Sequence, residues 1–547
     1  MKLVAGIDIG NSTTEIVISN GAEPIAWDRR PTRGIKGSEA SVNAALSLLQ
    51  NIEREHNLIA AQVAVAPWNP VHTLTSTIHE PLPNTGNLQI IMTAHQSVVG
   101  DGWVVGIPWL IADAINLGSP TIAIVPTGTG YEVAANRINE VLAQGAQIVG
   151  IVVADDEAVL IGKRVNGNLL VVDGADTATA LSARKLFLEV RPQSATVQTA
   201  TDIWALRAAL ELTEDEAEPL SEIVRWVRND RTVLIGLFAK TKNSIEIQNG
   251  FVTWRDGATL DLFDAVSKIS SSHIGDIAQL NTPDAVLTSD VWAFDITKVL
   301  ADRGLRQVGH TRDLALAQLA TTSIDSPGDL SEIFGVPVTV AQSEAQAAKL
   351  GAHSTPGLAL DAAVLDIGGG TIDLINTVEL SAAGAGELLT AAVAFALDTS
   401  RGAADWIKRG PAQRLESPHL LLAEDGSKAF TDESKPYPAS AMGSLIAPGP
   451  AGYLTFGQNL QPAEWRIMRQ ALKQAAIGSN VARLIRSMAK IEATERELNL
   501  VVVGGPAADD ELIPILSQVT GITAIGRGNV AGKLGHRYAV AYGLSQL

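Results

Sequence analysis

Cysteine is missing from this 547-residue chain, and its absence excludes whole classes of chemistry. Without thiols the chain forms no disulfide, no thiolate zinc site and no cysteine-bound iron–sulfur cluster. The nine histidines are scattered without the spacing of metal ligands. The sequence also lacks a Gly-x-Ser-x-Gly elbow or another nucleophile motif. Thiol, zinc and serine-nucleophile chemistry are therefore not expected.

Positive charge is in short supply. Lys and Arg number 41 against 59 Asp and Glu, which gives a net charge of −18 and a pI near 5.0. This balance argues against a general nucleic-acid binder, whose surface would be basic. A local basic run is interpreted as a solvated loop. It consists of Arg29, Arg30, Arg33 and Lys36.

Long apolar runs are missing as well. Residues 103–112 form an apolar run, but it contains Pro108 and stops at Asp113, well short of the roughly 20 residues that span a membrane. Near the N-terminus, Asp8 interrupts the apolar run, so no signal peptide is expected. The sequence predicts a soluble cytoplasmic protein with no membrane partner.

Two similar glycine-bearing phrases stand near the two ends of the chain. Residues 363–374 are an apolar strand that contains Asp366, a three-glycine turn and a second strand that contains Asp373. Residues 4–18 are again a strand with Asp-apolar-Gly, followed by a hydroxyl-rich turn and a second strand. A turn without Cβ atoms lets backbone N–H groups approach phosphate oxygens, and the aspartates are placed to hold Mg²⁺ directly or through water. The alternative for a single such phrase is an ordinary hairpin with a solvated Asp.

Two such hairpins predict two similar lobes that each supply one phosphate-binding turn to a shared cleft. In this the sequence resembles the actin, sugar-kinase and heat-shock-chaperone ATPase superfamily. Residues 344–352 resemble the helix before the second hairpin of the heat-shock ATPases, and residues 501–506 resemble their adenosine motif. The resemblance implies an α/β, two-lobed actin-like ATPase fold with ribonuclease-H-like lobes that binds ATP or ADP with Mg²⁺. The cluster-bearing relatives that activate radical dehydratases need cysteine ligands and are excluded.

The resemblance also gives the candidate site residues. Asp8 and Asp366 are predicted in the Mg²⁺ shell, with Asp373 as a third carboxylate. Glu344 is predicted to position the attacking water, the alternative being a helix N-terminal carboxylate stabilised by the dipole. The turns are predicted to bind the phosphates through Gly10, Asn11, Ser12, Thr13, Gly368, Gly369, Gly370 and Thr371. The adenosine wall is predicted at Gly504, Gly505, Pro506 and Arg527.

The length implies about three to five domains. We predict the first part of the ATPase lobes at 1–90, an inserted small α/β swivelling domain at 91–245, a mostly helical connector at 246–329 and the second part of the lobes at 330–547. An irregular insertion is expected near 401–461. Within the inserted domain, residues 158–164 are predicted to form a strand.

A closer resemblance runs along nearly the whole chain. It is carried by residues 5–15, Gly34-Ile35-Lys36-Gly37, Ala383-Gly384-Ala385-Gly386, residues 526–530 and residues 539–544. In these phrases the chain is similar to the large subunits of diol and glycerol dehydratase reactivases. The resemblance implies a chaperone-like ATPase that acts on an inactivated adenosylcobalamin-dependent dehydratase. It implies a small subunit that exchanges with a dehydratase subunit so that damaged cobalamin leaves, in a heterotetramer of two large and two small subunits.

The same resemblance implies a second Mg²⁺ at the junction with the small subunit. Its candidate ligands stand at predicted strand ends and are Asp155, Asp156 and Asp173. The family's glycine-rich loop with a metal-binding Thr is matched only by Gly100-Asp101-Gly102-Trp103. Two other functions stay open: a sugar or polyol kinase, which would need a carboxylate base and a sugar loop, and an actin-like scaffold.

Overall fold

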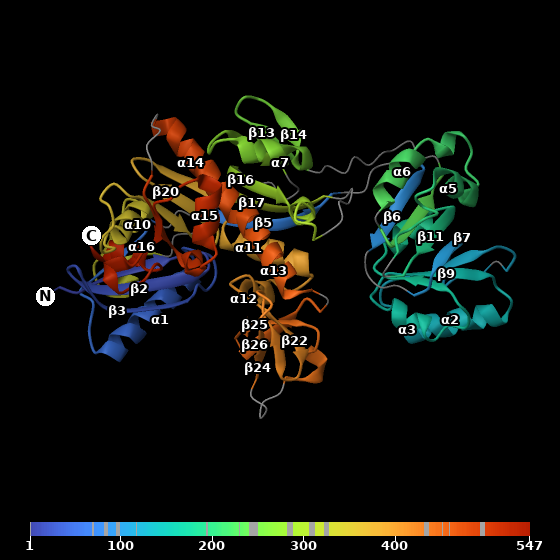
Figure 1. Ribbon diagram of the computed structural model, residues 1–547, viewed down its shortest axis with the longest axis horizontal. Helices are drawn as coiled ribbons and strands as arrows, with labels where there is room; N and C mark the ends of the chain where they lie inside the picture. The colour runs from blue at the N-terminus through green and yellow to red at the C-terminus, as the bar shows by residue number, and fades with distance from the viewer. Residues whose placement is uncertain are drawn as a thin grey trace. The chain divides into compact units, whose positions relative to one another are not determined.

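The chain is described here from a computed structural model in which two compact units are distinguished (Figure 1). Unit 1 comprises Met1–His79, Asn249–Arg306 and Arg312–Leu547, and unit 2 comprises Glu80–Gln248 and Gln307–Thr311. The structure describes residues 2–67, 71–80, 86–94, 99–115, 117–192, 195–228, 230–239, 250–281, 288–305, 312–321, 328–431, 437–450, 452–458, 460–492 and 498–547. Within these ranges, no helix combines the length and the apolar character needed to cross a membrane. The domain boundary predicted at 245–246 lies outside the described residues.

Unit 1 contains two five-stranded sheets that share one topology (Figure 1). In each sheet three antiparallel strands are followed by two parallel strands. The first sheet has the order β3 (Glu23–Pro31), β2 (Thr13–Asn20), β1 (Val4–Ile9), β4 (Gln62–Val65) and β18 (Val338–Val340). The second has the order β21 (Glu379–Ala383), β20 (Thr371–Ile375), β19 (Ala363–Ile367), β27 (Leu500–Val503) and β28 (Ile525–Arg527). The predicted pair of similar α/β lobes is confirmed.

A tightly packed pair of helices joins the two sheets. The helix α10 (Glu344–Ala352) follows the last strand of the first sheet, and α16 (Ala539–Ser545) follows the last strand of the second. A Cβ atom on Gly351 would lie 1.9 Å from the carbonyl oxygen of Ala539, and one on Gly543 would lie 1.9 Å from that of Ala347. The helices therefore touch backbone to backbone, which only glycine permits at these two positions.

The first sheet takes one strand from beyond residue 330. The helix α9 (Leu330–Phe334) packs Phe334 into the core of this sheet, and β18 pairs in parallel with β4. Residues 330–340, which the sequence placed in the second part of the lobes, thus complete the first sheet. The helix α1 (Glu39–His56) covers the same core, and its N-terminus is capped by Ser38, whose side chain accepts a hydrogen bond from the Ser41 N–H.

The prediction of a mostly helical connector at 246–329 is wrong. Five strands and two helices are described there: β13 (Phe251–Trp254), β14 (Thr259–Asp261), α7 (Leu262–Ser271), β15 (Ile277–Asn281), β16 (Thr288–Asp295), α8 (Ile296–Ala301) and β17 (Asp313–Thr321). The strand β17 is rich in Ala and Leu, which favour helices, but it is the middle strand between β16 and β5 (Val71–His79). Packing on both faces overrides its intrinsic propensity.

The insertion near 401–461 is more regular than expected. After α11 (Gly386–Leu397) and α12 (Arg401–Ile407), five strands between Gln413 and Phe456 form an antiparallel sheet. Its order is β24 (Lys428–Phe430), β23 (Leu420–Leu422), β22 (Gln413–Ser417), β25 (Leu445–Gly449) and β26 (Gly452–Phe456). We call it the insertion sheet. Its Pro and Gly residues lie in or next to the turns between short strands. Because such residues are also typical of irregular segments, the composition alone predicted an irregular insertion.

One long helical rod crosses unit 1. It consists of α13 (Pro462–Lys473), a π-helical turn at Gln474–Gly478 and α14 (Ser479–Glu492). The π turn leaves the carbonyl of Ala475 to accept a hydrogen bond from the Trp292 indole, at 3.2 Å. Further along, the fully buried Arg483 donates to both carboxylate oxygens of Asp290 on β16, at 3.2 and 2.6 Å. The rod is thereby fixed to the sheet that contains β16.

Unit 2 is a seven-stranded α/β sheet. Its order is β10 (Leu170–Val172), β9 (Ile148–Val153), β8 (Thr121–Val125), β7 (Gly102–Leu110), β11 (Lys185–Val190), β12 (Thr232–Leu237) and β6 (Leu88–Ala94). The first four strands are parallel and the others antiparallel. Its helices are α2 (Tyr131–Ala143), α3 (Ala158–Gly162), α4 (Thr177–Ser182), α5 (Ile203–Leu210) and α6 (Leu220–Val227).

The strand predicted at 158–164 is instead the short helix α3. Ala158 and Ile161 are buried, while Val159 and Leu160 are exposed, which is helical rather than alternating spacing. The N-terminus of the helix is held by Asp173, whose carboxylate accepts a hydrogen bond from the Ala158 N–H at 3.1 Å. The apolar pattern of residues 158–164 could not indicate that Asp173 caps a helix there, so the sequence alone predicted a strand.

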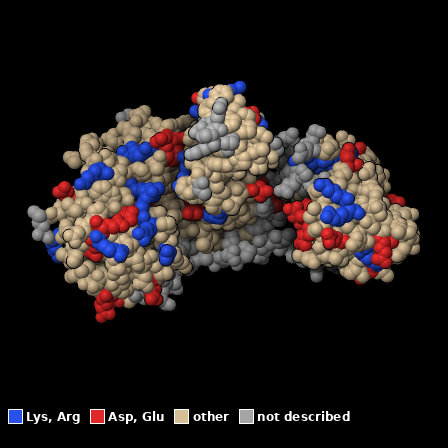
Figure 2. Space-filling model, turned by 90° about the horizontal axis from the view of Figure 1, so that it is seen from below, with Lys and Arg blue, Asp and Glu red and all other residues tan. Residues whose placement is uncertain are grey.

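Charged side chains of both signs lie side by side on the molecular surface. Figure 2 shows Lys and Arg next to Asp and Glu on the displayed face of each unit. Of the basic run in the first lobe, Arg29, Arg30 and Arg33 are exposed as expected. Lys36 is different, because only 11% of its side chain is exposed.

Candidate functional site

The two predicted phosphate turns have the same backbone geometry. In the first, the Gly10 N–H donates to the Thr13 carbonyl at 2.9 Å, and in the second the Gly368 N–H donates to the Thr371 carbonyl at 2.9 Å. The Thr13 hydroxyl donates to Glu15 at 3.3 Å, and the Thr371 hydroxyl donates to Asp373 at 3.2 Å. The strand registers pair Asp8 with Glu15 and Asp366 with Asp373. The hairpins are thus structural equivalents.

The turns face each other within unit 1. A Cβ atom on Gly369 would lie 2.4 Å from the Ser12 hydroxyl, and one on Gly370 would lie 3.0 Å from the side-chain nitrogen of Asn11. The same Cβ on Gly370 would lie 2.5 Å from the Thr73 hydroxyl, which is buried and has no hydrogen-bond partner among the described residues. A side chain at Gly369 or Gly370 would displace these groups, so the close approach of the two turns favours glycine at both positions. The structure thus brings the predicted phosphate-binding residues together.

Beside the turns lies an ion pair that was not predicted from the sequence. Glu387, near the N-terminus of α11, accepts a hydrogen bond from the Ser12 hydroxyl at 3.0 Å and pairs with Arg401 at 3.1 Å. Arg401 also donates to the Thr75 hydroxyl on β5 at 2.9 Å. Both charged side chains are exposed by more than a third, so their attraction is largely screened by solvent. Their contact with Ser12 still ties the first turn to α11 and α12.

Three half-buried carboxylates surround the turns, and the pKa of each is raised. Burial, then the charge of Glu344, raises the pKa of Asp8 well above its usual value. Burial, then Asp373, raises the pKa of Asp366 to about 8. Burial raises the pKa of Asp373 to about 6, although hydrogen bonds from the Ser381 and Thr371 hydroxyls oppose this. Crowded carboxylates of this kind are stabilised when a cation binds among them.

These aspartates fit a site in which Mg²⁺ is bound partly by carboxylates and partly by water molecules or phosphate oxygens. Among the described residues the Oδ1 atom of Asp8 has no hydrogen-bond partner although it is buried, as expected of an oxygen whose partner is a cation or its water shell. Within the described residues, no group of three or more His, Asp or Glu side chains is close enough to bind one ion by itself. Mg²⁺ usually keeps several waters and binds one or two carboxylates plus phosphates, so a less compact set suits it.

Lys36 and Glu344 form an ion pair at this site. The Lys36 ammonium lies 2.5 Å from the Glu344 carboxylate, at the N-terminus of α10. Burial alone would lower the pKa of Lys36, but Glu344 and Asp8, with Asp373 beyond them, raise it. The lysine therefore stays charged among the carboxylates. The sequence assigned Lys36 to a solvated loop, and the available signal was its position between Gly34 and Gly37.

The predicted adenosine motif follows β27. Gly504 has φ +91°, and a Cβ there would lie 2.3 Å from the Ile367 carbonyl and 2.4 Å from Asp366, so glycine is required. A Cβ on Gly505 would lie 3.0 Å from the guanidinium of Arg537, which also approaches Glu15 at 3.5 Å. Sequence reasoning missed Arg537, which no motif marks.

The other proposed member of the adenosine wall is engaged elsewhere. Arg527, on β28, binds Asp510 at 2.7 Å in the loop after Pro506. The guanidinium therefore supports the loop that carries the motif. Its proposed contact with adenosine remains a prediction.

The acidic residues of unit 2 divide into two roles. Asp155 accepts a hydrogen bond from the Gly128 N–H at 2.8 Å, so it holds a neighbouring loop. Asp156 and Asp173 lie at the ends of the adjacent strands β9 and β10 and interact with each other. Burial, then the charge of Asp156, raises the pKa of Asp173. A carboxylate pair of this kind suits a cation, although no third ligand joins it in the described residues.

Comparisons with known proteins agree with this geometry. Residues 277–547 match the family described as "Diol dehydratase reactivase ATPase-like domain", and residues 91–237 match "DD-reactivating factor swiveling domain". The chain is 24% identical over 610 positions to the propanediol dehydratase-reactivating factor large subunit of Salmonella typhimurium, covering 100% of this chain and 98% of the relative. It is 24% identical over 609 positions to the diol dehydratase-reactivating factor large subunit of Klebsiella michiganensis, with the same coverage.

Solved structures show the same fold. The nucleotide-free diol dehydratase-reactivating factor superposes with a TM-score of 0.57 at 22% identity, covering 100% of this chain and 99% of that one. A glycerol dehydratase reactivase superposes with a TM-score of 0.58 at 20% identity, covering 99% of each chain. Both the ATPase-like region and the swivelling region are thus matched, and the similarity extends over the full length. Because the two reactivase family models together match residues 91–237 and 277–547, the chain belongs to the diol dehydratase reactivase family, and it is similar over its full length to large subunits of that family.

Proposed function

We propose that this chain hydrolyses ATP to reactivate an adenosylcobalamin-dependent diol or glycerol dehydratase that has lost its intact cofactor. The observation that carries the proposal is the pair of equivalent hairpins, which place two phosphate-type turns and three half-buried carboxylates around Lys36. The full-length similarity to relatives named dehydratase-reactivating factors supplies the client class. The nucleotide would be ATP or ADP with Mg²⁺.

Each part of the site has a role in this reaction. Backbone N–H groups of the two turns bind the phosphates, and Asp8, Asp366 and Asp373 hold the metal shell. A bound Mg²⁺ supplies positive charge to the phosphate oxygens. Glu344 orients the attacking water, and the ion pair with Lys36 holds that carboxylate in place. Gly504, Gly505 and Pro506 provide the close backbone approach for adenosine.

The partner in this proposal is a small reactivase subunit, in a cytoplasmic heterotetramer of two large and two small subunits. Unit 2 would bind it, with Mg²⁺ between the subunits held by Asp156 and Asp173. Nucleotide hydrolysis would shift the population between states that bind the dehydratase subunit and states that release it. Damaged cobalamin leaves and a fresh cofactor enters.

A reactivation assay tests the proposal. The protein, together with a small reactivase subunit, is added to an inactivated dehydratase with ATP, Mg²⁺ and fresh adenosylcobalamin. Renewed dehydratase turnover that depends on ATP is the expected result. Failure to restore any activity would reject the client. ATP consumption that instead rises with added polyol would support the sugar-kinase alternative, and nucleotide-dependent polymerisation would support the scaffold.

The interface part is tested separately. Asp173→Asn should weaken capture of the small subunit, because a metal ligand is lost, while basal ATP hydrolysis stays within about twofold of the wild type since unit 2 lies outside the site. Glu132→Gln, an exposed change on α2, is the matched control. Unaltered capture by Asp173→Asn in a magnesium buffer would remove the interface metal from the proposal.

A further inference from the structure

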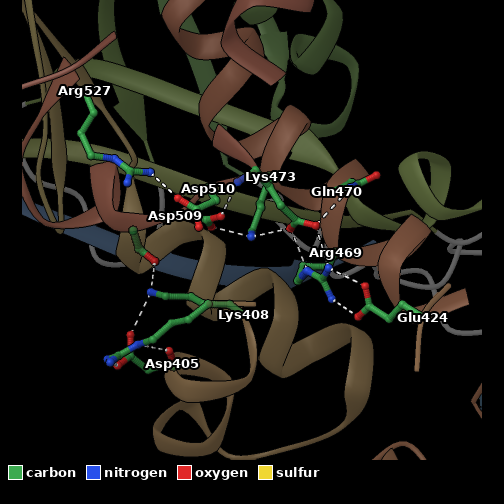
Figure 3. Close-up of polar contacts among 12 residues, drawn as sticks. Asp405, Lys408, Glu424, Arg469, Gln470, Lys473, Asp509, Asp510 and Arg527 are labelled. Atoms are coloured by element: carbon green, nitrogen blue, oxygen red, sulfur yellow. Dashed lines mark hydrogen bonds and ion pairs between the residues drawn. The ribbon is translucent and has the colours of Figure 1, made fainter. Parts of the chain in front are cut away.

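The adenosine motif is followed by three consecutive acidic residues, and each binds a cation. Asp509, Asp510 and Glu511 lie between the short helix η4 (Gly505–Ala508) and α15 (Leu512–Thr520). Lys473 pairs with Asp509 and, at 2.7 Å, with Glu511, while Arg527 pairs with Asp510. Figure 3 shows Lys473 and Arg469 directed from α13 toward this acidic loop. The loop that follows Gly504 to Pro506 is thus held in place by Lys473 and Arg527.

The cations on α13 are completely buried. Arg469 and Lys473 lie one helical turn apart, and the side chain of each is 0% exposed. Burial alone would raise the pKa of Glu511, but hydrogen bonds from Arg469, with the charge of Lys473, lower it to about 2. A buried cation that loses its carboxylate is strongly destabilised. The two cations are therefore satisfied only when the acidic loop is docked, which gives the adenosine motif one preferred position.

The same guanidinium reaches the insertion sheet. Arg469 donates to both oxygens of Glu511, at 2.8 and 2.7 Å, and to both oxygens of Glu424, at 2.6 and 3.0 Å. Glu424 follows β23 and also accepts a hydrogen bond from the Ala412 N–H at 2.9 Å. Two bidentate carboxylates need the planar fork of arginine, and lysine cannot reproduce them. One side chain thus joins the adenosine loop to the insertion sheet (Figure 3).

We propose that Arg469 and Lys473 are positioning residues of the adenosine subsite, and that Glu424 couples this subsite to the insertion sheet. The inference rests on the proposed nucleotide site at Gly504 to Pro506. The phosphates are held by the two hairpin turns, so a ligand that lacks adenosine does not use the coupled loop. Coupling between sites is reciprocal, and a nucleotide that fixes the loop also steadies the sheet.

The test compares binding of Mg²⁺–ADP with binding of Mg²⁺–tripolyphosphate, which offers phosphates without adenosine, by titration calorimetry. In Arg469→Lys the Kd for ADP should rise about tenfold or more, while that for tripolyphosphate changes less than about twofold. Arg466→Lys, an exposed change on the same helix, should leave both constants unchanged. An equal loss for both ligands would indicate general damage and overturn the proposal, as would no loss for ADP.

A second measurement uses the wild-type chain alone, in case the variant fails to fold. ADP should slow hydrogen exchange in residues 412–424 more than tripolyphosphate does, because only ADP engages the loop bound to Arg469. Equal protection by the two ligands overturns the coupling. If the wild type binds neither ligand, the proposed nucleotide site itself is wrong. Binding of both ligands without a difference in the variant rejects only the positioning role.

Discussion

The two hairpins share one backbone design but differ in what neutralises their carboxylates. In the first, Glu15 faces the guanidinium of Arg537 at 3.5 Å, which opposes the effect of burial on its pKa. At the equivalent place in the second, Asp373 accepts hydrogen bonds from the hydroxyls of Thr371 and Ser381. The carboxylate of the first hairpin is thus paired with an arginine, whereas that of the second is held by two hydroxyl groups. A repeated fold therefore does not imply repeated chemistry.

The equivalent aspartates Asp8 and Asp366 should matter most. Asp8→Asn and Asp366→Asn should each lower the turnover of ATP by about a hundredfold or more, because each removes metal-held stabilisation of the transition state. Steady-state hydrolysis at saturating Mg²⁺ and ATP measures this. Asp361→Asn, an exposed change just before β19, is the control. Normal turnover in both folded variants would show that the hairpins do not form the site.

Lys36 tests whether the site needs its cation. Lys36→Gln should lower turnover by about tenfold to thirtyfold, because Glu344 and the aspartates lose the charge that offsets their repulsion. Arg33→Gln lies in the same loop with an exposed side chain, and it should stay within about twofold of the wild type. Equal rates for the two variants would show that turnover does not depend on the charge of Lys36.

Glu15 and Asp373 sharpen the comparison, since they occupy matching positions. Asp373→Asn should lower turnover about tenfold, whereas Glu15→Gln should change it less than about threefold, because the charge of Glu15 is matched by Arg537. The pair is best measured side by side with a titration of Mg²⁺, where only Asp373→Asn should require more metal. Equal effects would mean that both hairpins bind the cation.

The raised pKa of Asp366 predicts a smaller effect, on stability without ligand. The folded protein keeps this proton up to a pKa of about 8, while the unfolded chain releases it near pH 4. The unfolded state binds fewer protons between these values, so the free energy of unfolding falls as the pH rises from about 4 to about 8. The free energy of unfolding of Asp366→Asn at pH 8 should therefore exceed that of the wild type by about 1 kcal/mol or more. Denaturant unfolding should show this advantage shrink toward pH 4, and an advantage constant with pH would contradict the assignment.

Local patterns predicted part of this molecule well. The strand, turn and strand around Asp8 and Asp366 are encoded within a dozen residues, and the structure places their turns face to face. Lys36 could not be recognised in the same way, because its partner Glu344 is 308 positions away in the sequence. The helix formers of β17 likewise gave the wrong element, because its place between two strands depends on distant chain. The predictions failed where the structure depends on contacts between residues that are distant in the sequence.

The π-helical turn at Gln474–Gly478 sets the rotational phase of the rod formed by α13 and α14. Arg469 before it faces the acidic loop, and Arg483 after it faces Asp290. Each residue of an α-helix turns the chain by about 100°, and the wider π turn accommodates one extra residue, so the same sequence wound as regular α-helix would rotate α14 by about that angle relative to α13. Arg483 would then leave Asp290 while Arg469 kept its partners. The widened turn therefore lets one continuous helical segment hold the acidic loop through Arg469 and Asp290 through Arg483.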